Sequence, residues 1–188
     1  MIAPDEVRDI MNSDHTEQKI KILEMTCECK DITILNTVIL ALDDNDIRVR
    51  GEAFSALVQN ENDISVILMQ SLKNQNKNVR GFSALILANR NDRKAIPKIM
   101  DLASDDSAMV RSCAIGALGY LKAKEAIHII QKGMEDSIPE VKKSAIKAAI
   151  DIGDKTAFKR LDEISTRDPE FRSLLVYAKN KLGGPGGI

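Results

Sequence analysis

Polar stretches along the chain alternate with segments in which small and aliphatic residues recur at helical spacing. Each polar stretch is followed by an apolar residue and then a basic one, and these pairs recur at intervals of 30, 31, 31 and 30 residues. The five pairs are Val49-Arg50, Val79-Arg80, Val110-Arg111, Val141-Lys142 and Phe171-Arg172. A fixed period of this length predicts a repeat architecture instead of a single central core.

Each repeat is expected to be a helical hairpin. Counted from the apolar residue of the pair, positions four, five, seven and eight are small or aliphatic, as in Ala114, Ile115, Ala117 and Leu118. This spacing places them on one face of a helix. A further apolar helix precedes each polar stretch, and we expect these first helices at 32–42, 64–72, 95–103, 126–134 and 157–164. The sequence contains no strand pattern.

Several residues mark the predicted helix ends. Asp31, Asp63 and Asp154 precede first helices and are suited to accept hydrogen bonds from backbone N–H groups there. Gly119, Gly153 and Gly183 are expected near helix C-termini, where glycine adopts the left-handed conformation readily.

Neither helix of such a hairpin can bury its apolar face alone, so the hairpins must stack. We therefore predict an all-α fold, a right-handed α-α superhelix of about five hairpins with about twelve helices and no β-sheet. The expected units are a degenerate N-terminal helical cap at 1–30, an array at 31–182 and a flexible Gly/Pro tail at 183–188. The array divides at about 31–60, 61–92, 93–122, 123–153 and 154–182.

The recurring residues resemble a known family. Residues 43–53 and 105–119 are similar to HEAT repeats, and most similar to the short phycobilisome-lyase-type HEAT-like repeats. Ala95-Ile96-Pro97 and Ala126-Ile127 match the start of the following first helix in that pattern. The resemblance covers roughly 31–182 and implies an α-solenoid. It also implies that the recurring basic residue serves the interior of the stack.

The composition agrees with a core made of thin layers of small aliphatic side chains between stacked helices. Aromatic residues make up only 3% of the 188 residues, and there is no Trp. The 27 basic and 28 acidic residues give a net charge of −1, which disfavours a dedicated nucleic-acid binder. The charge is mildly asymmetric, at −3 for residues 1–94 and +2 for residues 95–188.

The sequence indicates a cytoplasmic protein. Three cysteines are too few for a disulfide scaffold. The N-terminus lacks the pattern of a signal peptide, and the longest apolar run, Val38 to Leu42, is far shorter than a membrane span. We expect no membrane association.

The basic residues of the pairs form a ladder with two possible roles. Paired with the acidic turns, they could tie successive repeats together by charge-assisted hydrogen bonds. Alternatively they could form a stripe that follows phosphates, although the acidic turns would cancel much of that attraction. We favour the structural role for this ladder, which comprises Arg50, Arg80, Arg111, Lys142 and Arg172.

Candidate chemistry is sparse. Cys27 and Cys29 form a C-x-C motif, but a zinc site needs four converging ligands, and the chain has only two histidines, His15 and His128. The chain has no nucleophile elbow, no phosphate-binding glycine loop and no His-Glu pair of the kind that holds iron in some HEAT-repeat enzymes. We therefore predict no catalytic residues, no metal and no cofactor.

The remaining candidate site is a surface. The second helices of such a solenoid line its concave side, and positions six and ten after each apolar residue of the pair should face outward there. The candidate partner-binding residues are Ser55, Gln59, Leu85, Asn89, Tyr120, Lys147, Asp151, Tyr177 and Lys181. We interpret the protein as a non-enzymatic scaffold or adaptor that binds a protein partner on this side.

Two alternatives stay open. The family resemblance suggests that the protein is a bilin lyase-type accessory or catalytic subunit. The basic C-terminal half suggests a helical-repeat protein that binds nucleic acid.

Overall fold

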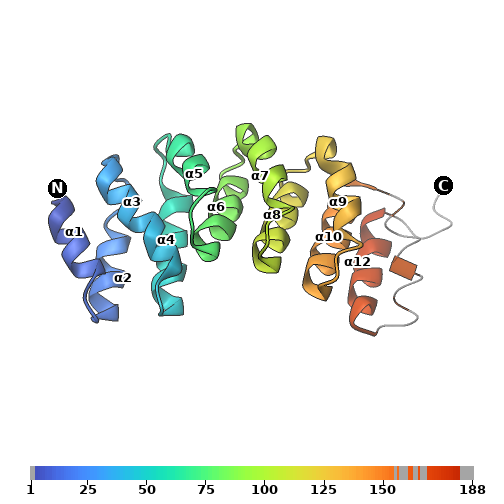
Figure 1. The fold of residues 1–188 in the computed structure, drawn as a ribbon, viewed down its shortest axis with the longest axis horizontal. Helices are drawn as coiled ribbons and strands as arrows, with labels where there is room; N and C mark the ends of the chain where they lie inside the picture. The colour runs from blue at the N-terminus through green and yellow to red at the C-terminus, as the bar shows by residue number, and fades with distance from the viewer. Residues whose placement is uncertain (1–2, 155, 157–160, 163–164, 166–168, 183–188) are drawn as a thin grey trace. The chain divides into compact units, whose positions relative to one another are not determined.

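The computed structural model describes residues 3–154, 156, 161–162, 165 and 169–182, and these form helices and turns without a strand. The chain divides into two compact units, Met1–Ala95 and Ile96–Ile188, which are described separately. Figure 1 shows helical hairpins in each of them. The predicted repeat boundaries, cap and tail stay predictions.

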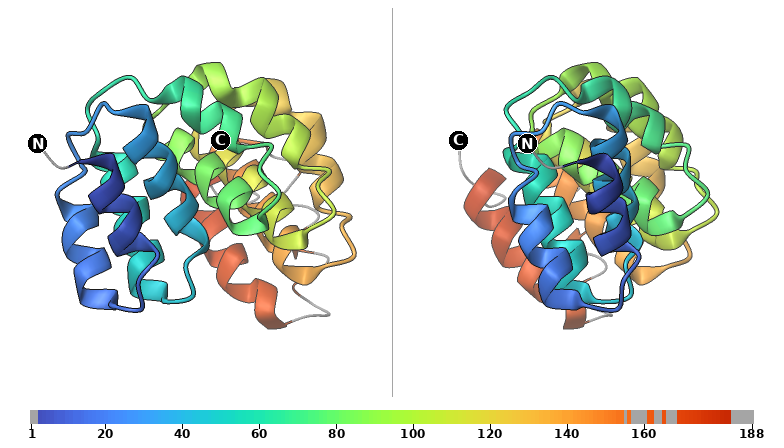
Figure 2. Two further views of the ribbon diagram at one scale, coloured as in Figure 1. Left: turned by 60° about the vertical axis from the view of Figure 1, so that its left-hand side comes forward. Right: turned by 90° about the vertical axis from the view of Figure 1, so that its left-hand side faces the viewer.

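Unit 1 consists of helical hairpins in two layers (Figures 1 and 2). The first helices contact each other in the order α1, α3, α5, and the second helices in the order α2, α4, α6. The elements are α1 (Pro4–Met11), α2 (Thr16–Glu24), α3 (Ile32–Leu40), η1 (Ala41–Asp43), α4 (Ile47–Gln59), α5 (Ser65–Ser71), α6 (Lys77–Asn89) and η2 (Arg93–Ala95).

Unit 2 repeats the arrangement. Helix α7 packs on α8 and α9 on α10, while α10 lies between α8 and α12 in the layer of second helices. The elements are α7 (Ile96–Leu102), α8 (Ala108–Tyr120), η3 (Lys124–Ala126), α9 (Ile127–Gly133), α10 (Pro139–Ile152), η4 (Pro169–Phe171) and α12 (Arg172–Leu182). Most of the first helix expected at 157–164 lies outside the described residues.

The core of each unit is a set of thin layers between helices. The apolar residues that open the repeats are fully buried at Val49, Val79, Val110 and Val141. Four residues further on, the chain has small, fully buried side chains at Ala53, Ser83, Ala114 and Ala145. The hydroxyl of Ser83 pairs with that of Ser71 at 2.7 Å, so its polar atom is satisfied. Small residues at these positions allow the helices to pack closely.

The three aspartates expected at the starts of first helices each accept a hydrogen bond from a backbone N–H group. Asp31 caps α3, because its carboxylate accepts from the backbone N–H of Thr33 and Ile34 at 2.8 and 3.2 Å. Asp63 accepts from the N–H of Ser65 at 3.2 Å. Asp154 accepts from the N–H of Thr156 at 2.9 Å.

The three glycines expected at helix C-termini differ in role. Gly153 has φ of 85° at the end of α10, as expected. Gly119 lies one residue before the end of α8, as expected, but it does not share the positive φ of Gly153. An added Cβ at Gly119 would lie 2.6 Å from the Cα of Ala148 on α10, so this glycine provides the space for close packing of α8 and α10. Gly183 lies outside the described residues.

Gly119→Ala is expected to lower the free energy of unfolding by about 1–3 kcal/mol, because the new methyl group overpacks the contact of α8 with α10. Gly116 on the same helix has no atom within 4 Å of an added Cβ, so Gly116→Ala is the matched control. It should raise the free energy of unfolding by up to about 1 kcal/mol, because alanine favours helix over glycine. Urea unfolding followed by circular dichroism measures both. Equal stability of the two variants would contradict the close contact.

Candidate functional site

At three of the five positions of the basic ladder, the side chain donates hydrogen bonds to backbone carbonyls of the turn that precedes its helix. The Nη1 of Arg50 donates to the carbonyl oxygens of Asp44 and Asn45 at 2.7 and 3.1 Å. Arg80 and Arg111 repeat this arrangement, with Nη1 distances of 2.8 to 3.1 Å to the carbonyls six and five residues earlier. Each guanidinium therefore satisfies carbonyls of the turn that precedes its helix.

Arg111 also joins two repeats of unit 2. Its Nε and Nη2 donate to the two carboxylate oxygens of Asp136 at 2.7 and 3.0 Å, a bidentate pair. The bond from Arg111 lowers the pKa of Asp136, and the charge of Lys142 contributes to that lowering. Asp136 also accepts from the N–H of Ile138, just ahead of α10. The Arg111 side chain thus holds α8 to the turn that precedes α10.

The last two positions of the ladder differ. Lys142 is half-buried. Its ammonium lacks the planar guanidinium with which Arg111 bonds two carbonyls and a carboxylate at once. Arg172 is exposed at the start of α12, and the turn that precedes it lies largely outside the described residues.

The nine candidate partner-binding residues are all exposed or half-buried. In unit 1 they form local bonds on α4 and α6. The Nε2 of Gln59 donates to the hydroxyl oxygen of Ser55 at 2.5 Å. The Nδ2 of Asn89 donates to the carbonyl oxygen of Leu85 at 2.8 Å. This face of unit 1 is polar except at the half-buried Leu85.

In unit 2 three of the candidates come together between α10 and α12. The Nζ of Lys147 donates to Oδ2 of Asp151 at 2.9 Å, and the hydroxyl of Tyr177 donates to Oδ1 of the same carboxylate. The Nζ of Lys147 also lies 5.6 Å from the centroid of the Tyr177 ring. We call these three residues the α10–α12 cluster.

Tyr120 and Lys181 lie on the same layer of second helices. Tyr120 ends α8 with 62% of its surface exposed, and Lys181 is exposed near the end of α12. A tyrosine this exposed contributes little to the core and offers a large, rigid contact area.

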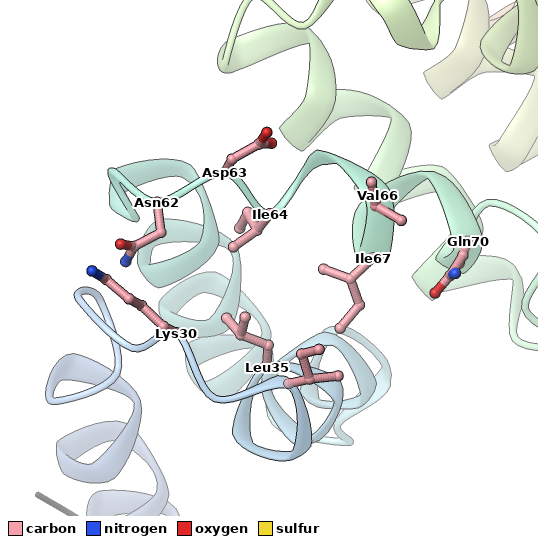
Figure 3. A pocket seen from close by; sticks show the side chains of 9 residues that line it. Lys30, Leu35, Asn62, Asp63, Ile64, Val66, Ile67 and Gln70 are labelled. Atoms are coloured by element: carbon pink, nitrogen blue, oxygen red, sulfur yellow. The ribbon is translucent and has the colours of Figure 1, made fainter.

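A hollow on the other layer of unit 1 was not predicted from the sequence. It has a volume of about 460 Å³ and lies between α3 and α5, where the side chains of Leu35, Ile64 and Ile67 converge (Figure 3). At its edge, Ile32 and Val66 are 68% and 64% exposed. The segment at 32–40 is apolar over most of its length, but which of its side chains stay exposed depends on the neighbouring helices.

The described residues contain no group of three or more His, Cys, Asp or Glu side chains that could hold a metal ion. Cys27, Cys29 and Cys113 are free thiols and half-buried. Burial raises the pKa of Cys113 to about 11, so this thiol is protonated at neutral pH and is a weak nucleophile. Within the described part of the chain, no helix is long and apolar enough to cross a membrane.

These observations define a class, an all-α solenoid of HEAT-like helical hairpins, as the sequence predicted. Residues 65–127 match the family model of HEAT repeats, so the resemblance to HEAT repeats is confirmed. The comparison with curated proteins gives no match.

Solved structures share the fold. The chain is similar to the complex of CpcE and CpcF of phycocyanin lyase from Nostoc sp. PCC7120, with a TM-score of 0.60, 19% identity, and coverage of 97% of this chain and 78% of that one. A designed armadillo repeat protein in complex with the peptide (KR)4 gives a TM-score of 0.55 at 16% identity, with coverage of 95% and 98%. An engineered protein gives 0.54 at 18% identity, with coverage of 97% and 99%. At these identities the likeness shows the fold.

The pKa of Tyr177 tests the α10–α12 cluster. The hydrogen bond to Asp151, with burial and the nearby negative charge, raises this pKa to about 12 from its usual value of about 10. Protonated Tyr177 therefore stabilises the folded state below about pH 10, and this contribution is lost as the pH rises through about 12. Asp151→Asn should move the tyrosinate absorbance step of Tyr177 down toward about pH 10.

Tyr177→Phe identifies that step, because the variant should lack it while Tyr120 remains. A titration of the Asp151→Asn variant that coincides with that of the unsubstituted chain would contradict the hydrogen bond.

Proposed function

We propose that the protein is a non-enzymatic interaction scaffold that holds a partner protein on the face formed by its second helices. One observation carries this proposal. The candidate positions on these helices are exposed or half-buried, while on α6, α8 and α10 the three positions between positions six and ten are all buried. In α8, for example, Ala117 and Leu118 are fully buried but Tyr120 is 62% exposed. At Tyr120, packing within unit 2 therefore leaves most of the side chain available to a partner.

The physical character of the face in unit 2 supports a protein partner. Tyrosine is enriched at the centres of protein interfaces, where it buries a large area at low entropic cost. The α10–α12 cluster already restrains Lys147 and Tyr177 through Asp151. Ordering these side chains on binding therefore costs less than ordering free ones.

The structural neighbours support a protein partner by analogy. CpcE and CpcF form a complex with each other, and the designed armadillo repeat protein is in complex with a peptide. Both are properties of those proteins, and their fold is what this chain shares.

A bilin lyase-type role is a second candidate, supported by the likeness to the phycocyanin lyase complex. Incubation of the protein with a free bilin, followed by absorbance spectroscopy, tests it directly. A shifted bilin spectrum would favour this role over the scaffold, whereas an unchanged spectrum would argue against it.

Leu85→Ala, Tyr120→Ala and Tyr177→Ala combined are expected to weaken partner capture by at least about tenfold, because they remove the apolar and aromatic candidate side chains from the second helices of each unit. Affinity capture from the native lysate with quantitative mass spectrometry measures this. Circular dichroism verifies that the helices persist.

Ile32→Ala, Leu40→Ala and Val66→Ala provide the matched control, since they remove three exposed apolar side chains from first helices. Capture by this control should equal capture by the unsubstituted chain. Loss confined to the control, or undiminished capture by the first variant, would contradict the proposed face.

A further inference from the structure

Basic side chains gather on two neighbouring second helices of unit 2. Together, α10 and α12 carry six basic residues against two acidic ones, Glu140 and Asp151. The basic residues are Lys142, Lys143, Lys147, Arg172, Lys179 and Lys181. These adjacent helices therefore carry an excess of basic residues in a chain whose net charge is −1.

Part of this charge lies in a defined row. Lys143, Lys147 and Asp151 are spaced by four residues on α10, as are Tyr177 and Lys181 on α12, so each set shares one helix face. The ammonium of Lys143 lies 5.8 Å from the centroid of the Phe171 ring, and that of Lys147 lies 5.6 Å from the Tyr177 ring. These contacts show that the row of α10 meets both η4 and α12.

The single acidic member of the row is already compensated. Asp151 accepts from both Lys147 and the hydroxyl of Tyr177, so its carboxylate and the ammonium of Lys147 offset each other within the α10–α12 cluster. The row still carries a net positive charge, because it has three lysines and one aspartate. Lys181 lies one turn beyond Tyr177 on the same face and is exposed.

From this arrangement we infer that the face of α8, α10 and α12 binds an acidic segment of the partner protein. Carboxylates of the segment pair with Lys147 and Lys181, and an apolar side chain packs on the exposed ring of Tyr120. Complementary charge steers such encounters and fixes the register of the bound segment. This inference rests on the proposed scaffold function and names the chemistry of its partner.

The geometry favours a polypeptide over a nucleic acid. Single-stranded nucleic acids need open aromatic faces on which bases stack. Lys147 lies over the ring of Tyr177, which leaves Tyr120 as the exposed ring of the face.

A peptide-binding measurement on the full chain tests the inference. The probes are fluorescein-labelled (EEL)4, its basic counterpart (KKL)4 and a twelve-nucleotide oligothymidylate, and fluorescence anisotropy reports binding. We expect (EEL)4 to bind and to lose at least about tenfold in affinity between ~0.05 M and ~0.5 M NaCl, because salt screens exposed charges. The basic peptide should not bind. Tighter binding of the oligothymidylate than of (EEL)4, or no binding of (EEL)4, would overturn the inference.

Charge-reversal variants locate the site. Lys147→Glu with Lys181→Glu should lower the affinity for (EEL)4 by at least about tenfold, because two attractive contacts become repulsive. Lys98→Glu with Lys132→Glu is the matched control, with the same change of charge on the exposed first-helix surfaces of α7 and α9. This control should change the affinity by less than about twofold. Equal losses in the two variants would overturn the assignment to this face.

The double substitution could disturb the α10–α12 cluster, so Lys181→Glu alone serves as a second variant. It should still lower the affinity for (EEL)4 severalfold. Lysate capture distinguishes failure of the acidic preference from failure of the scaffold function. If the unsubstituted chain captures a partner and both charge-reversed variants capture it equally well, the acidic preference is overturned and the scaffold function is not. No capture by the unsubstituted chain would overturn the scaffold itself.

Discussion

The structure depends on the fact that no hairpin of this chain can bury its apolar face alone. Each layer of core is therefore shared between neighbouring helices and is only one side chain deep. Within unit 2 the layer is so thin that Gly119 leaves no room for a methyl group against Ala148. This constraint accounts for the scarcity of aromatic residues, because a large ring at such a contact would force the helices apart.

The same constraint separates the residues that stabilise the fold from those available to a partner. Arg50, Arg80 and Arg111 lie at regular intervals, yet each is bonded to carbonyl oxygens of its own turn. Arg111 adds a bidentate pair with Asp136. Guanidinium groups occupied in this way make poor phosphate ligands, which supports the structural role of the ladder. We propose that recognition instead uses positions six and ten of the second helices.

The sequence predicted the architecture because a repeat is a local pattern. The period of the Val-Arg pairs and the spacing of small residues depend on neighbours within one hairpin, as does the Asp31 cap. The sequence also indicated that ladder residues could pair with acidic turns, but not which side chains of two hairpins would meet. The bonds of Arg111 with Asp136 and of Tyr177 with Asp151 join residues 25 and 26 positions apart. Periodicity determines which face is buried, but not which polar side chains meet when two hairpins stack.

The hollow between α3 and α5 shows that contacts of apolar side chains between hairpins were equally hard to predict from the sequence. Hydrophobicity placed Ile32 and Val66 within helices but did not reveal that their neighbours leave them exposed. The packing role of Gly119 was not predicted for a related reason, since a glycine near a helix end has the same sequence signature whether it serves a turn or a close contact. Both features depend on the approach of a neighbouring helix, which a single sequence does not encode locally.

Site-specific photo-crosslinking tests the central claim, that the second helices form the partner-binding face. Benzoylphenylalanine is introduced in place of Tyr120 on α8 or, as a comparison, in place of Ile32 on α3, and each protein is irradiated in the native lysate. The account predicts a discrete protein adduct from position 120 and none from position 32. An adduct from position 32 alone would contradict it.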